Sequence, residues 1–90
     1  MTKPQAFAGS LESNDILISI THTDAKENTI KLDSIVLQQY GPAILALIRE
    51  NLARFELDHV HVHAQDKGAL DCTISARMET AILRYKELAL

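Results

Sequence analysis

The chain lacks several features that mark specialised classes of protein. Its single cysteine, Cys72, excludes an intrachain disulfide and any Cys-x-x-Cys metal or redox site. Twelve acidic residues outnumber nine basic ones, and no cluster of Lys and Arg occurs, so the basic face of a general nucleic-acid binder is absent. No run of about 18 apolar residues is present, nor an N-terminal stretch of signal-peptide type. We therefore expect no contact with nucleic acid or membrane, and a reducing cytoplasm as the compartment.

The remaining composition is that of an ordinary folded domain. The 90 residues are 47% hydrophobic and 23% charged, which is enough apolar surface to build a core without disulfides or metals. No repeat, low-complexity tract or linker divides the sequence. We expect residues 1–90 to form a single domain.

Alternating apolar residues predict strands in the first third of the chain. Ile16, Ile18 and Ile20 recur with the period of two that is typical of a strand with one face on a core. Ile30 and Leu32 repeat the pattern, and the polar residues 23–28 between these two segments predict an antiparallel hairpin. Residues 6–11 form a weaker candidate for a first strand, because several of them are small.

A long helix is predicted after these strands. Asp33 and Ser34 offer a cap, and apolar residues at three-and-four spacing continue to about residue 55. These residues are Val36, Leu37, Tyr40, Ile44, Leu47, Ile48, Leu52 and Phe55. Pro42 has no N–H to donate to the carbonyl of Gln38, so it predicts a kink, or a helix that restarts with Pro42 in its first turn.

The last segment has two interpretations. A helix to about residue 87 would place six apolar residues on one side, namely Leu70, Ile74, Met78, Ala81, Ile82 and Tyr85. A hairpin over residues 69–76 is the alternative, because Asp66-Lys67-Gly68 is good turn chemistry and the next apolar residues also alternate. We favour the helix, because its apolar stripe extends over four turns.

Residues 59–63 predict a further strand, with valines on one face and histidines on the other. Three imidazoles on one face suggest a metal site. Successive same-face residues of a strand lie about 6.5–7 Å apart at Cα, however, and His59 and His63 are separated by two such steps, which is too far for both to bind one ion. We therefore expect solvent-facing or helix-covered polar residues here. The order βββαβα predicts an α+β fold, a two-layer sandwich with two helices on one face of a mainly antiparallel sheet.

Few residues are candidates for chemistry. Glu12-Ser13-Asn14-Asp15 is typical of an exposed turn between residues 7–11 and 16–20, which makes Ser13 accessible but indicates no reaction by itself. No histidine accompanies Ser13, so a hydrolase triad is unsupported. Cys72 is expected to be a small residue on a buried flank of the last helix. Asp66, Lys67 and Asp71 are expected to cap and solvate the turn, and the charged residues of the helices, Arg77 included, to be solvated.

Three motifs together resemble the acyl carrier protein (gamma subunit) family of citrate lyase, over residues 4–85. They are Ala8-Gly9-Ser10-Leu11-Glu12-Ser13-Asn14-Asp15, Gln39-Tyr40-Gly41, and Asp66-Lys67-Gly68-Ala69-Leu70-Asp71-Cys72. In that family the first motif reads Ala-Gly-Thr/Ser-Leu-Glu-Ser-Gly-Asp, and its second serine matches Ser13. Asn14 stands where the family usually has glycine, and both residues accept left-handed turn geometry.

The resemblance implies a non-catalytic carrier subunit of a lyase complex. Ser13 would be joined by a phosphodiester to 2'-(5''-phosphoribosyl)-3'-dephospho-CoA, with Glu12, Asn14 and Asp15 as neighbours, and no metal. The terminal thiol would hold acetyl or citryl groups while citrate is cleaved to oxaloacetate and acetate. The implied partners are the alpha (acyl transferase) and beta (citryl lyase) subunits and the transferase that attaches the group.

Two alternatives remain open. The carrier subunit of malonate decarboxylase resembles this family and uses the same type of group, although its third motif tends to Gly-Ala followed closely by proline. An unmodified interaction domain of the same fold is the other. From their positions, we also hypothesise that Glu12 and Asp15 repel the phosphates of the attached group and provide a docking signal for the attaching enzyme.

Overall fold

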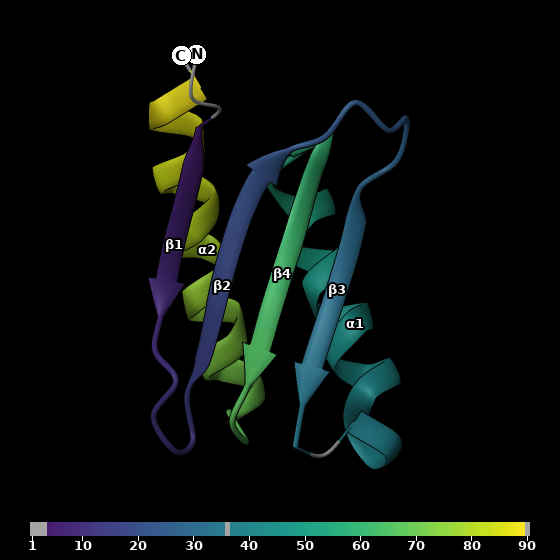
Figure 1. Cartoon of the computed structure of the whole chain (residues 1–90), viewed down its shortest axis with the longest axis vertical. Coiled ribbons are helices and arrows are strands. Elements are labelled where there is room, and N and C mark those ends of the chain that lie inside the picture. The colour runs from purple at the N-terminus through teal and green to yellow at the C-terminus, as the bar shows by residue number, and fades with distance from the viewer. Residues whose placement is uncertain (1–3, 36, 90) are drawn as a thin grey trace.

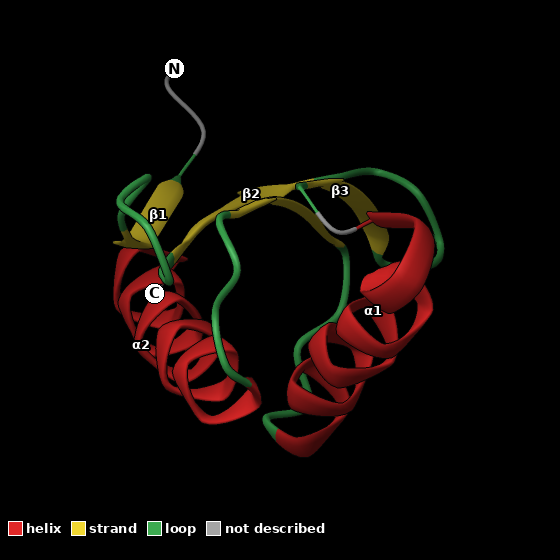
Figure 2. Cartoon of the chain, turned by 90° about the horizontal axis from the view of Figure 1, so that it is seen from below, coloured by secondary structure: helices red, strands yellow, loops and turns green. Residues whose placement is uncertain are grey.

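A four-stranded sheet forms one layer of the molecule, and two helices cover one of its faces (Figures 1 and 2). The computed structural model describes residues 4–35 and 37–89, with the backbone alone at 37 and 38. The elements are β1 (Gln5–Gly9), β2 (Ile16–His22), β3 (Thr29–Ser34), α1 (Leu37–Arg54), β4 (Val60–Asp66) and α2 (Asp71–Ala89). The predicted α+β two-layer fold, the order βββαβα and the placement of both helices on one face are confirmed.

The sheet is mixed, with the strand order β1-β2-β4-β3. β2 pairs antiparallel with both β1 and β4, whereas β3 pairs parallel with β4. The sheet is thus mainly antiparallel as predicted, but the hairpin predicted between β2 and β3 is wrong, because β4 lies between them. Two features explain this order. A helix joins β3 to β4, which is the kind of crossover that parallel neighbours need, and β4 has the more buried inner face and occupies the centre.

The segment that was predicted to be a hairpin turn, residues 23–28, instead passes the start of β4. The side chain of Asn28 holds it there: Nδ2 donates to the carbonyl of Leu57 at 2.7 Å, and Oδ1 accepts from the N–H of Val60 at 3.1 Å. The N–H of Thr23 donates to the carbonyl of His59 at 2.9 Å. These bonds satisfy backbone groups of Thr23 and of residues 57–60, and they join the segment to the chain that enters β4.

The core lies between the sheet and the helices. The three isoleucines of β2 predicted to face it are fully buried, and each contributes about 1.5–3 kcal/mol relative to an exposed side chain. β1 covers residues 5–9 rather than 6–11, and it buries Ala6 and Ala8, whereas Phe7 points to the open face of the sheet. These small inner side chains let α2 pack closely on the edge of the sheet.

α1 is unbroken, with Pro42 inside it, so the predicted restart at Pro42 is wrong. The predicted cap is also wrong, because Asp33 and Ser34 are the last residues of β3. α1 buries Ile44, Ile48 and Leu52 as predicted. The expected apolar contributions of Val36 and the Leu37 side chain lie outside the described part of the chain.

Beyond Arg54, α1 ends in a left-handed residue, Glu56, with a φ of 53°. The Glu56 N–H donates to the carbonyl of Ala53 at 3.0 Å, and the Leu57 N–H donates to that of Leu52 at 3.0 Å. This pair of bonds is the Schellman arrangement, which satisfies carbonyls at a helix end. It turns the chain sharply toward β4.

α2 confirms the helical interpretation of the last segment, and the hairpin over residues 69–76 is wrong. Five of the six predicted residues are buried along it, namely Ile74, Met78, Ala81, Ile82 and Tyr85. Leu70 differs: it precedes the helix and is 70% exposed. Neither described helix has the length and apolar character needed to cross a bilayer.

Candidate functional site

The Ser13 turn connects β1 to β2 at one end of the sheet. Figure 1 shows that the connection from β4 to α2 lies at the same end, where β3 also ends and α1 begins, while β1 begins and α2 ends at the opposite end. Ser13 is exposed as predicted, and its hydroxyl has no hydrogen-bond partner among the described residues. It is therefore a free oxygen at the tip of a short connection.

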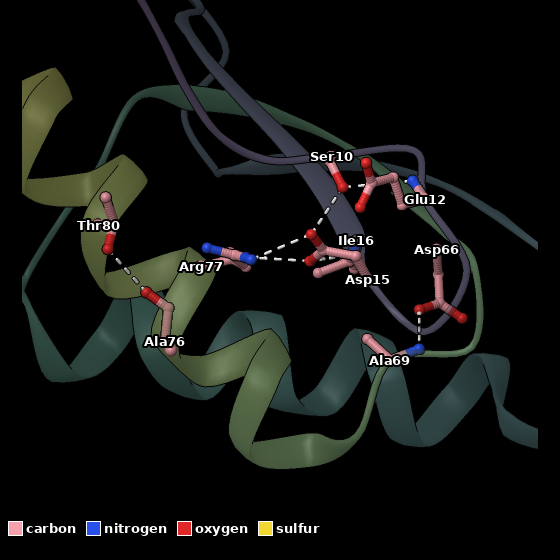
Figure 3. A network of polar contacts seen from close by, with 9 residues as sticks. All are labelled: Ser10, Glu12, Asp15, Ile16, Asp66, Ala69, Ala76, Arg77 and Thr80. Atoms are coloured by element: carbon pink, nitrogen blue, oxygen red, sulfur yellow. Dashed lines mark hydrogen bonds and ion pairs between the residues drawn. The ribbon is translucent and has the colours of Figure 1, made fainter.

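The other serine of the turn, Ser10, has a different environment. Its hydroxyl donates to Oδ2 of Asp15 at 2.7 Å and accepts from the N–H of Glu12 at 3.2 Å (Figure 3). A serine that bonds a backbone N–H two residues on is a common turn-forming device. Ser10 thus shapes the turn, and of these two serines Ser13 alone has a hydroxyl that no described residue engages.

Asp15 holds the turn to α2. Nε and Nη2 of Arg77 each donate to a different oxygen of the Asp15 carboxylate at 3.0 Å, and the N–H of Ile16 donates to Oδ1 at 2.7 Å (Figure 3). Hydrogen bonds from Arg77, and secondly from Ser10, lower the pKa of Asp15 to about 2, because they favour the charged form. The same pair raises the pKa of Arg77. The carboxylate is charged at neutral pH and faces the protein, with 14% of its side chain exposed.

The backbone of the turn is fixed on its other side by the connection between β4 and α2. The N–H of Asn14 donates to the carbonyl of Lys67 at 2.8 Å, and the Lys67 N–H donates to that of Asp15 at 2.9 Å. Asn14 has a φ of 66°, the left-handed geometry expected at this position. Gly68, with a φ of 87°, lies so close that a Cβ there would be 3.8 Å from Oδ1 of Asn14. The two connections thus form one unit.

Asp66 organises the second connection from inside. It is 2% exposed, accepts from the Ser34 hydroxyl at 2.9 Å, and accepts from the N–H of Ala69 at 3.0 Å. The expectation that Asp66 caps this turn is confirmed. Its burial was not predicted, and its hydroxyl partner comes from β3, which the sequence did not place beside β4.

The histidines do not converge on one point. His61 Nδ1 lies 2.7 Å from Oγ1 of Thr29, and His63 Nε2 lies 2.9 Å from Oδ2 of Asp33, whose pKa this contact lowers. His59 precedes β4 with a φ of 60°. Within residues 4–35 and 37–89, no group of three or more His, Cys, Asp or Glu side chains could hold a metal ion. The two strand histidines instead link β4 to β3 on the open face.

Two expectations about single residues are wrong. Cys72 is exposed, not buried on a helix flank. Arg77, which was expected to be a solvated residue of the helix surface, binds Asp15 from 62 positions away. The sequence alone contains no local signal for that pairing, because the residues around Asp15 and Arg77 do not indicate that the two lie close together in the fold. Asp15 was placed among the site residues, but as an outward charge.

Comparison with known proteins identifies the family of the chain. A sequence model of the family described as "ACP: Malonate decarboxylase delta subunit (MdcD)" matches residues 3–85. The citrate lyase acyl carrier protein of Streptococcus equi subsp. equi (strain 4047) is 48% identical over 82 residues, covering 91% of this chain and 80% of that protein. That of Escherichia fergusonii is 42% identical, covering 91% and 84%. The chain belongs to this acyl carrier family.

The fold also agrees with that of a solved structure. A chain of a Pseudomonas malonate decarboxylase hetero-tetramer, in a complex with malonate, superposes with a TM-score of 0.65 at 15% identity, covering 94% of this chain and 84% of that one. At this identity the likeness concerns the fold alone. Acyl carriers hold a covalently attached prosthetic group, and the free Ser13 hydroxyl on a turn fixed at both ends fits such an attachment.

Proposed function

We propose that this chain is the acyl carrier subunit of citrate lyase and that Ser13 is the residue that carries its prosthetic group. One observation supports the site above all: the motif contains two serines, and only the Ser13 hydroxyl is exposed and unpaired among the described residues. The 42–48% identity to citrate lyase carriers supports the choice of complex.

The group in question is 2'-(5''-phosphoribosyl)-3'-dephospho-CoA, joined through a phosphodiester to the Ser13 oxygen. When bound, it supplies a thiol that forms thioesters with acetyl and citryl groups. The protein contributes a rigid point of attachment: Ser10 and Asp15 shape the turn, and the backbone bonds of Asn14 and Asp15 with Lys67 fix it. The chain has no catalytic residue in this proposal, because the alpha and beta subunits perform the two reactions. Tethering keeps the intermediate at a high effective concentration near both.

The hypothesis about the acidic neighbours of Ser13 now applies to one residue. The Asp15 carboxylate is turned toward Arg77 and compensated by it, so it does not face the attached phosphates. Glu12 is exposed, and its side chain makes no hydrogen bond within the described residues. We propose Glu12 as the acidic signal beside the attachment point, read by the transferase. A cytoplasmic location, where Cys72 stays reduced, belongs to the same proposal.

The carrier subunit of malonate decarboxylase is a second candidate, because the matching family model is described as the malonate decarboxylase delta subunit and the similar fold comes from a malonate decarboxylase hetero-tetramer. Reconstitution separates the two. The loaded chain is mixed with citrate lyase alpha and beta subunits, or with the remaining subunits of malonate decarboxylase. Oxaloacetate formation from citrate in the first mixture alone is the expected result. Malonate decarboxylation in the second mixture alone would assign the chain to the other complex.

A further inference from the structure

A pocket with a cavity volume of about 610 Å³ lies beside the Ser13 turn. Its walls come from α1, from the end of β4 and the connection to α2, and from the first turn of α2, and it includes Tyr40, Ala43, Ile44, Ala69, Leu70 and Cys72. The same connection binds the Ser13 turn through Asn14 and Lys67. Gly68 lines the pocket and also lies next to the turn, since a Cβ added at this glycine would be 3.8 Å from Oδ1 of Asn14. The pocket and the turn are therefore neighbours at one end of the molecule.

The lining suits a flexible organic chain with few charges. The volume lies within the range of about 300–1,000 Å³ found for small-molecule sites. Tyr40 is 56% exposed and Leu70 is 70% exposed, so two large apolar side chains at its rim are covered by no described element. Covering them removes apolar surface from water, which favours binding.

The charges of the pocket limit what it can accept. Among the described residues, Asp66 and Asp71 are the only carboxylates that line it, and no lysine, arginine or histidine does. Asp66 is buried with both oxygens bonded, so its hydrogen bonds are already satisfied inside the protein. A neutral thiol or acetyl thioester meets no repulsion here. A citryl thioester retains free carboxylates, and like charges at close range are unfavourable.

We propose that this pocket is a resting site for the thiol end of the group attached at Ser13, occupied when that end is free or carries acetyl and vacated when it carries citryl. This inference rests on the proposed function and adds a selectivity to it. The acetyl form is sheltered between encounters, whereas the citryl form is presented to the partner subunits. Tyr40, Ala43 and Leu70 hold the arm, and Asp66 and Asp71 exclude the charged cargo.

The test uses Cys72, the only cysteine of the chain and part of the pocket wall. The rate of Cys72 alkylation by iodoacetamide is measured, with peptide mass spectrometry, for the full chain without its group, with the acetylated group and with the citrylated group. Acetyl loading is expected to slow alkylation about two- to ten-fold, since a short tether gives an effective concentration in the millimolar range. With the citrylated group, Cys72 is expected to be alkylated at the same rate as in the unloaded chain.

A pair of variants links any protection to the pocket. Ala43→Phe fills the pocket from an exposed position on α1, and Ala46→Phe places the same side chain at another exposed position of that helix, outside the lining. For each variant, the alkylation rate of the unloaded chain is divided by that of the acetylated chain. Any shielding of Cys72 by the new phenylalanine itself affects both rates and therefore cancels in this ratio. The ratio should fall to one in Ala43→Phe and keep its wild-type value in Ala46→Phe.

Each result has one meaning. Intact mass is recorded first, and a chain that never gains the group contradicts the proposed function. If the group is attached but acetyl loading leaves alkylation of Cys72 unchanged, the pocket proposal is overturned and the carrier function stands. Equal protection by acetyl and citryl, or protection that persists in Ala43→Phe, would also overturn it.

Discussion

Nε and Nη2 of Arg77 each lie 3.0 Å from one carboxylate oxygen of Asp15, so a residue of α2 binds the turn that contains Ser13. A two-point pairing of this kind fixes orientation as well as distance. The carboxylate also accepts from Ser10 and from the N–H of Ile16. The Ser13 turn is thus part of the folded body. If Ser13 carries the group as proposed, the mobility of the arm comes from the group itself.

Loss of this pair should destabilise the protein in a coupled way. Asp15→Asn and Arg77→Met should each lower the free energy of unfolding, since hydrogen bonds to charged groups are among the stronger ones, and each loss should be modest because part of the pair is solvated. The double variant should lose clearly less than the sum, because both changes remove the same interaction. Urea unfolding of the four proteins measures this, and additive losses would show that the pair contributes nothing.

The same carboxylate gives a defined pH dependence. Its pKa is lowered from 3.8 to about 2 in the folded protein, so folding favours the ionised form. The resulting stability is complete above the unfolded pKa and disappears as the pH falls through the folded one. The difference in unfolding free energy between wild type and Asp15→Asn should be constant near neutrality and shrink between about pH 4 and pH 2. Asp58→Asn, at an exposed residue with no described hydrogen bond, is the control. A difference that grows toward low pH would contradict the assignment.

Two glycines at this end of the molecule should respond differently to alanine. Both have positive φ, 92° at Gly9 and 87° at Gly68, so each substitution carries backbone strain of about 1–2 kcal/mol. A Cβ at Gly9 would also lie 1.8 Å from the carbonyl oxygen of Ile16, whereas one at Gly68 would meet only contacts at 3.8 Å. Thermal unfolding should show a much larger loss for Gly9→Ala than for Gly68→Ala. Equal losses would mean that strain alone decides both positions.

Much of the fold could be predicted because its periodicities are local. The isoleucines of β2 and the apolar stripe of α2 identify their elements without knowledge of any partner. Strand pairing could not be predicted in the same way, since alternation shows which face is buried and not which strand lies alongside. The polar segment 23–28 looked like a hairpin turn, although it passes a strand that comes later in the sequence.

The site was predictable to a different extent. Turn chemistry alone indicated that Ser13 is exposed, and the family resemblance alone indicated a role for it. The separate roles of Ser10 and Ser13 depend on hydrogen bonds within the folded turn, and the inward orientation of Asp15 depends on Arg77, which is distant in sequence. Leu70 was expected to be buried as the first residue of the helical stripe, and Cys72 as a small residue on a buried flank, but the buried residues of α2 begin at Ile74.

The most direct measurement is the intact mass of three proteins, each co-expressed with the enzymes that attach the prosthetic group: wild type, Ser13→Ala and Ser10→Ala. We predict that wild type and Ser10→Ala gain the mass of the group, which peptide fragmentation locates on Ser13, and that Ser13→Ala gains nothing. Ser10→Ala is the matched control, because it removes the other hydroxyl of the same turn. An adduct that persists in Ser13→Ala, or that is lost only in Ser10→Ala, would contradict the assignment of Ser13 as the attachment site.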